Sequence, residues 1–223
     1  MFVMTLLSIA EAASRLGVST RQVQHLIVQG AVRQLARGIV DETSVERLVA
    51  VRGNAHGRAW SEETAWGAVS LLSGGDADWM GQSQRSRLQA RLRDIEAGEL
   101  VERARNRAHV TRYQSHPSVE AQLRSLLIDS AHAAEELGLV ASTKIDGYLA
   151  TNDVDSALRT YGLINDDDGN VTLRATTMDL TVVNGLAQGG VVLAALDHAE
   201  SLDVREYRAG TEALNRILET FRE

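Results

Sequence analysis

The chain of 223 residues contains no cysteine, which excludes disulfide bonds, thiol catalysis and cysteine-based zinc sites. It also lacks any apolar run near the roughly twenty residues that a membrane-spanning helix needs. The apolar stretch of residues 1–7 is short and follows no basic segment, so it does not resemble a signal peptide. We therefore expect a cytoplasmic protein without membrane contact. Hydrophobic residues make up 44% of the chain, which is enough for one or two domains.

Lysine occurs once, at Lys144, so arginine supplies nearly all the positive charge, a bias that a GC-rich genome explains as readily as function does. The formal net charge of −7 is divided unevenly along the chain. Residues 1–117 hold fifteen arginines and twelve acidic residues, whereas residues 118–223 hold eight basic and eighteen acidic residues. Because salt screens charges beyond about 10 Å, local charge decides nucleic-acid binding. The N-terminal half is therefore the candidate for contact with DNA.

Two capping boxes of the form Ser-x-x-Glu/Gln predict two short helices near the N-terminus. Ser8 and Glu11 form the first box, Ser19 and Gln22 form the second, and Gly17 between them permits a tight turn. Gly30 predicts the end of the second helix. Apolar residues at helical spacing give both helices one face to bury against each other.

A small hairpin is predicted over residues 32–40, where apolar and polar residues alternate around the turn at 36–38. Asp41 then predicts the cap of a third helix. Residues 1–56 are thus predicted to form a winged helix-turn-helix domain, whose second helix fits the major groove of DNA. A domain of about fifty residues is marginal alone, so it requires further packing or dimerisation.

This N-terminal pattern resembles the excisionase and MerR-like winged-helix family. The resemblance covers the first quarter of the chain and rests on Leu7, Ala12–Ala13, Leu16–Ser19 and Val23-x-x-Leu26-Ile27. The chain departs from many members at Gly38–Val40, where a tryptophan often stands beside the wing.

The residues expected to contact DNA lie on the second helix, the hairpin and the segment after the third helix. Arg21 would reach phosphate or guanine, and Gln24 would pair with adenine. Arg33 and Arg37 would contact phosphates. The Gly-rich segment 52–58 is interpreted as a flexible linker in preference to a basic arm. The full set is Ser19, Thr20, Arg21, Gln24, His25, Arg33, Arg37, Arg52 and Arg58.

Residues 57–108 are predicted to be a linker and a helical segment, with one helix capped by Ser61 and ended by Gly74–Gly75 and another beginning near Ser83. In residues 109–223, segments with the spacing of a helix alternate with segments that have the apolar–polar alternation of a strand. Strands are predicted at 109–113, 145–149 and 171–175, and helices at 119–128, 130–137, 153–161, 191–201 and 204–221. The fold class expected is therefore mainly α with a mixed α/β C-terminal domain, of unassigned sheet order.

Residues 103–223 resemble the C-terminal domain of AbiEi-type antitoxins from type IV toxin–antitoxin systems. The motifs that carry the resemblance are Ser130–Ala134, Leu137–Leu139, Lys144–Tyr148, Tyr161–Leu163, Gly169–Arg174 and Val191–Asp197. Family members join a winged helix to such a domain, repress their own operon and counteract a nucleotidyltransferase toxin encoded nearby. The resemblance implies these properties here, although the excisionase-like first domain and the helical segment after it depart from the family.

No catalytic residue, metal site or cofactor is expected. Asp166–Asp168 fits a turn, and a calcium loop that began at Asp166 would need an acid near Thr177. The glycines match no phosphate loop, the six histidines lack ligand spacing, and no nucleotidyltransferase motif is present.

The sequence therefore predicts a sequence-specific DNA-binding regulator, and the AbiEi resemblance makes an autoregulating antitoxin the first expectation. One small winged helix makes few contacts, so we expect a homodimer on an inverted repeat in its own promoter. Two alternatives stay open. One is a stand-alone regulator whose acidic C-terminal domain senses a ligand or oligomerises, and the other is a protein-interaction module.

Overall fold

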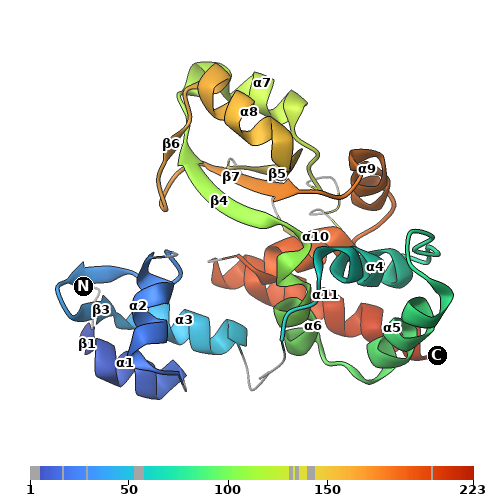
Figure 1. The fold of residues 1–223 in the computed structure, drawn as a ribbon, viewed down its shortest axis with the longest axis horizontal. Coiled ribbons are helices and arrows are strands. Elements are labelled where there is room, and N and C mark those ends of the chain that lie inside the picture. Colours follow the sequence, from blue (N-terminus) through green and yellow to red (C-terminus); the bar gives the residue numbers. More distant parts are fainter. Residues whose placement is uncertain are drawn as a thin grey trace. The chain divides into compact units, whose positions relative to one another are not determined.

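The computed structural model describes residues 6–16, 18–28, 30–52, 58–130, 133, 136–139, 144–201 and 203–223. It is a mixed α/β structure and mainly helical, as expected (Figure 1). The chain divides into two compact units, an N-terminal unit of Met1–Ala55 and a C-terminal unit of His56–Glu223.

The N-terminal unit contains a small antiparallel sheet and three helices. The elements are β1 (Leu6–Ser8), α1 (Ile9–Leu16), α2 (Thr20–Val28), β2 (Gln34–Ala36), β3 (Ile39–Asp41) and α3 (Glu42–Arg52). Strand β3 lies between β1 and β2 and is antiparallel to both. The core is formed by Leu7, Ala12, Ala13, Val23, Leu26, Val32, Val40 and Val45.

The predicted helix caps of this unit are confirmed. The Ser8 amide donates to Glu11 Oε2 at 2.8 Å, and the Ser19 amide donates to Gln22 Oε1 at 3.0 Å. Gly30 has a φ of 72°, the left-handed conformation that ends a helix at a glycine. Asp41 accepts from the amides of Thr43 and Ser44 at the start of α3. The predicted turn residue Gly17 lies outside the described residues.

The C-terminal unit has a helical half. Its elements are α4 (Glu62–Leu72), α5 (Gln82–Asp94), α6 (Ala97–Ala104), η1 (Arg105–Arg107), α9 (Leu180–Gln188), α10 (Val192–Ala199) and α11 (Val204–Arg222). They enclose one apolar core, in which Trp66, Leu100, Leu196 and Leu214 are fully buried.

The other half of this unit is a four-stranded sheet with the order β5-β7-β4-β6. The elements are β4 (His109–Gln114), η2 (Pro117–Val119), α7 (Glu120–Leu126), β5 (Ile145–Ala150), η4 (Thr151–Asp153), α8 (Val154–Tyr161), β6 (Ile164–Asn165) and β7 (Val171–Thr176). Strands β5 and β7 are parallel, and β4 is antiparallel to both β7 and β6. Helices α7 and α8 cover one face of the sheet, through Leu123 and Ala157 (Figure 1).

Two features differ from the sequence-based expectation. Residues 57–108 and 109–223 form one compact unit rather than two parts, because α4 and α6 share a core with α10 and α11. Helices α6 and α9 were not predicted, whereas the three predicted strands are confirmed to within one residue. Most of the helix predicted at 130–137 lies outside the described residues.

Within the described chain, no single helix has the length and apolar character to cross a membrane. Helices α9 and α10 meet that test only as a pair, and the pair is bent by 94°.

Candidate functional site

One face of α2 is polar and exposed to solvent. Thr20, Arg21, Gln24 and His25 are exposed and follow the spacing i, i+1, i+4 and i+5, which places them on the same side of the helix. The opposite side carries Val23 and Leu26 into the core. The pattern of polar and apolar residues therefore decides which face of α2 is exposed to solvent.

The hairpin carries two further exposed arginines. Arg37 lies at the turn between β2 and β3, where Gly38 has a φ of 80°. Arg33 precedes β2, and its amide donates to Ser44 Oγ at 3.1 Å, which ties the hairpin to α3. Their side chains are thus displayed on a hairpin that the core holds in place.

The other predicted contact residues have different settings. Ser19 is exposed, but its hydroxyl accepts from the Gln22 amide at 3.3 Å as the cap of α2. Arg58 belongs to the C-terminal unit, where its carbonyl accepts from Arg103 Nη1 at 3.2 Å. The side chain of Arg52 lies outside the described residues. Seven of the nine predicted residues therefore lie on α2, its cap and the hairpin.

The acidic residues of the N-terminal unit lie outside residues 12–40 of the sequence. The unit has six arginines and four acids, and residues 12–40 contain no acid at all. Glu11 accepts from the Ser8 amide, which lowers the pKa of its carboxyl group, and Asp41 caps α3. Arg15 pairs with Glu42 at 2.5 Å and with Glu46 at 2.9 Å. The α2 face and Arg37 thus belong to a segment without an acid, whereas Arg33 lies opposite Asp41, the last residue of β3, whose amide donates to the Arg33 carbonyl at 2.9 Å.

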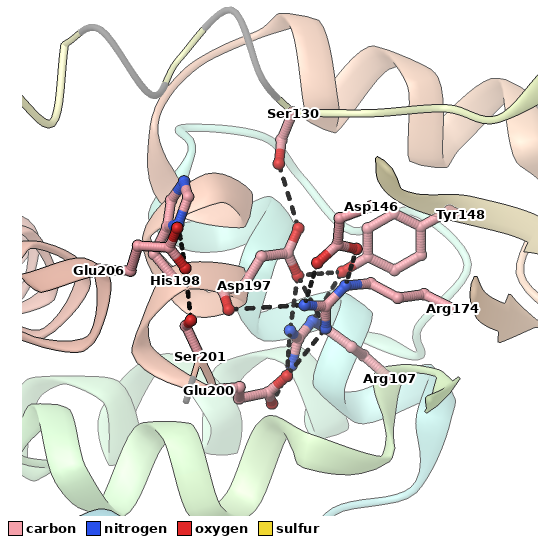
Figure 2. A network of polar contacts seen from close by, with 10 residues as sticks. All are labelled: Arg107, Ser130, Asp146, Tyr148, Arg174, Asp197, His198, Glu200, Ser201 and Glu206. Atoms are coloured by element: carbon pink, nitrogen blue, oxygen red, sulfur yellow. Dashed lines mark hydrogen bonds and ion pairs between the residues drawn. The ribbon is translucent and has the colours of Figure 1, made fainter. Parts of the chain in front are cut away.

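The C-terminal unit contains an ionic network between its sheet and its helices, in which both arginines and Asp197 are buried and Asp146 is 44% exposed (Figure 2). The network joins η1 and α10 to strands β5 and β7. Its charged members are Arg107, Asp146, Arg174, Asp197 and Glu200, and the Tyr148 hydroxyl completes it.

Each arginine of the network donates two hydrogen bonds to one carboxylate. Arg107 donates to the two carboxylate oxygens of Glu200 at 2.6 and 2.8 Å. Arg174 donates to those of Asp146 at 2.7 and 2.9 Å. The side chains of Arg107 and Arg174 are only 1% and 5% exposed, so both charges depend on these partners.

Asp197 is the additional carboxylate between the two guanidinium groups. It accepts from Arg107 Nη2 at 2.7 Å, from the Tyr148 hydroxyl at 2.5 Å and from Ser130 Oγ at 3.1 Å. Burial alone would raise the pKa of Asp197, but Arg174 and Arg107 together hold it below its usual value. Burial raises the pKa of Tyr148, so this hydroxyl keeps its proton and donates it to Asp197.

The geometry of the network favours a structural role. All three nitrogens of the Arg107 guanidinium donate to protein oxygens, which leaves none for a ligand. Nearby, Ser201 donates to Glu206 rather than to His198, so that histidine does not activate the hydroxyl (Figure 2). No cluster of three potential metal ligands occurs among the described residues. The network therefore holds the sheet against the helical half.

Sequence reasoning did not find this network. Arg107 belongs to the alternating run Arg103, Arg105 and Arg107, and it differs locally from the other two only because no acid stands three or four positions before it. The available signal was Asp197, the single acid of α10, which directly follows the apolar run Val192–Leu196. A helix that is apolar on every side is buried, and a charge within it must be paired.

Comparisons with protein-family models, with curated proteins and with solved structures find no match. A functional assignment therefore depends on the geometry and charge described above.

Proposed function

We propose that the chain is a sequence-specific DNA-binding regulator. In this proposal the N-terminal unit is a winged helix-turn-helix domain, α2 is its recognition helix, and β2 and β3 form its wing. One observation carries the proposal: the exposed polar face of α2 and the two hairpin arginines belong to a segment, residues 12–40, that contains no acid. A face of this charge and width suits the major groove of DNA.

The residues of the two elements would divide the work of recognition. Arg33 and Arg37 contact phosphates and thereby fix the position of the domain on the duplex. Gln24 pairs with an adenine edge and Arg21 contacts guanine or phosphate, so α2 supplies the sequence preference. The positive end of the α2 helix dipole, at the N-terminus of the helix, would also favour a nearby phosphate oxygen. Two copies of the domain would read an inverted repeat.

The test uses the full chain, its upstream DNA and a pool of random duplexes from which binding sequences are selected. We expect an enriched inverted repeat and an affinity that falls steeply with salt. Arg37→Ala lowers the slope of log affinity against log salt by about 1 and weakens all sequences alike. Gln24→Ala costs about 1–3 kcal/mol at one or two base pairs only.

Arg91→Ala is the matched control. It removes the same charge as Arg37→Ala, but from a half-exposed position on α5 of the C-terminal unit. It leaves the salt slope unchanged. Absence of any enriched sequence would refute the proposal. Unchanged binding after replacement of both Arg21 and Gln24 by alanine would refute the assignment of α2.

The C-terminal unit is proposed to be the antitoxin part of the protein, on the resemblance of residues 103–223 to AbiEi-type antitoxins. Its seventeen basic and twenty-six acidic residues suit a basic partner, which we propose to be a nucleotidyltransferase toxin encoded nearby. The regulator would act in the cytoplasm and without catalysis of its own. Co-expression tests this: the full chain rescues growth from the adjacent toxin, and residues 1–55 alone do not. Rescue by residues 1–55 would leave a stand-alone regulator as the better account.

A further inference from the structure

Val28 is the most exposed large hydrophobic side chain among the described residues, with 84% of its surface accessible. It ends α2, four residues after Gln24 and eight after Thr20, so it lies on the same helix face as these polar residues. The neighbouring Leu26 and Val23 are buried in the core. The unit thus places an apolar side chain on an otherwise polar face, where its exposure to solvent contributes no hydrophobic stabilisation to the fold.

The proposed partner of this face offers a specific apolar group. In the major groove, the edges of unmodified base pairs present donors, acceptors and a single apolar group, the C5-methyl group of thymine. We propose that Val28 contacts a thymine methyl group and makes the protein prefer an A·T base pair at that position. This inference rests on the proposed function, since it needs α2 in the major groove.

The helix geometry predicts where the thymine lies. Four residues of α-helix rise about 6 Å, and successive base pairs are about 3.4 Å apart. The thymine that Val28 contacts should therefore lie within about two base pairs of the adenine that Gln24 reads. The ligand expected is therefore a DNA half-site that contains both this thymine and the adenine contacted by Gln24.

The experiment removes the methyl group from the DNA and leaves the protein unchanged. In the sequence selected by the full chain, each thymine of one half-site is replaced singly by deoxyuridine, which lacks only the C5-methyl group. We expect one position to bind about fourfold more weakly, the value of burying one methyl group. At the other positions the replacement has no effect.

Val28→Ala completes a double-mutant cycle with the deoxyuridine duplex. The variant binds the natural duplex about fourfold more weakly, and deoxyuridine at the sensitive position causes no further loss. The matched control is Val49→Ala on α3, because Val49 is also exposed, at 40%, and belongs to the same unit. This control binds both duplexes like the unchanged protein.

The outcomes separate this inference from the proposed function. If the unchanged protein selects no DNA sequence, both fail. If it selects a sequence but no thymine is sensitive, or the losses from Val28→Ala and deoxyuridine add, only the inference fails. If Val28→Ala changes the oligomeric state by light scattering and the deoxyuridine duplexes bind normally, a second copy of the chain covers Val28, and the thymine contact is overturned.

Discussion

Replacing Arg107 by methionine should strongly destabilise the C-terminal unit. The substitution keeps a long apolar side chain but removes the donors to Asp197, Glu200 and Tyr148. In the unchanged network two guanidinium groups face three carboxylates, whereas in the variant one guanidinium faces three. Breaking a buried ion pair in this way costs about 3–5 kcal/mol, since it leaves a buried charge without its partner.

Asp197→Asn should cost less, although it changes a residue at the centre of the same network. Without Asp197, Arg107 still has Glu200 and Arg174 still has Asp146, so two positive charges face two negative charges. Asparagine keeps an acceptor oxygen for Arg107 and Tyr148, and its amide nitrogen can donate to Ser130 Oγ where the carboxylate accepted from it, so the main loss is the additional strength of charged hydrogen bonds. The expected cost is about 1–3 kcal/mol.

Urea unfolding monitored by tryptophan fluorescence measures both variants. All three tryptophans, Trp60, Trp66 and Trp79, belong to the C-terminal unit, so the signal reports on that unit alone. Arg91→Met is the control, because Arg91 pairs with Glu99 at a half-exposed site where a salt bridge contributes about 1 kcal/mol or less. The midpoint gives the change in unfolding free energy as long as the slope is unchanged.

The expected order of destabilisation is Arg107→Met, then Asp197→Asn, then Arg91→Met. Equal costs for the Arg107 and Arg91 variants would show that the buried network contributes no more than a surface pair. A larger cost for Asp197→Asn than for Arg107→Met would refute the view that Asp197 is the additional carboxylate.

Two further predictions concern the same unit. Because the guanidinium groups hold the pKa of Asp197 below 3.8, its ionisation contributes stability above that pH, and the contribution is lost as the pH falls through the lower folded value. The difference in unfolding free energy between Asp197→Asn and the unchanged protein should therefore shrink below pH 3.8, measured by urea titrations at several pH values. Gly210→Ala should destabilise by about 1–3 kcal/mol or more, since its Cβ would lie 2.5 Å from the Ala195 carbonyl oxygen, while Gly185→Ala has open space and should be neutral or stabilising.

The caps of the N-terminal unit could be predicted from the sequence because their information is local. Ser8 with Glu11 and Ser19 with Gln22 form hydrogen bonds between residues three positions apart. Gly30 and Asp41 likewise act on their immediate neighbours. The starts of α1, α2 and α3 and the end of α2 therefore follow from short motifs, without knowledge of the core.

The C-terminal unit was predictable only in part, because its packing joins distant segments. The alternation of residues 145–149 and 171–175 predicts two strands, but not that β5 and β7 are parallel neighbours. The helices at 62–104 were expected to be a separate segment, since their own pattern does not reveal that α10 and α11 supply the rest of their core. Helix α9 combines apolar residues with a central glycine, which weakens the helical signal.

The rule that a buried charge must be paired identifies Asp197 as a member of the network, but it does not identify Arg107 as its partner. Asp197 directly follows the apolar run Val192–Leu196 and is buried, and a buried carboxylate requires a cationic partner or a hydrogen-bond donor. The partner was not identified from the sequence, because Arg103, Arg105 and Arg107 share one alternating pattern and differ only in whether an acid stands three or four positions earlier. Arg103 pairs with Glu99 and Arg105 with Glu102, both within one helical turn, whereas Arg107 reaches a residue ninety positions away. The arginine without an acid three or four positions earlier is the one that is buried. In such a run, the absence of an acid at i−3 or i−4 is therefore the sequence feature that indicates a buried arginine.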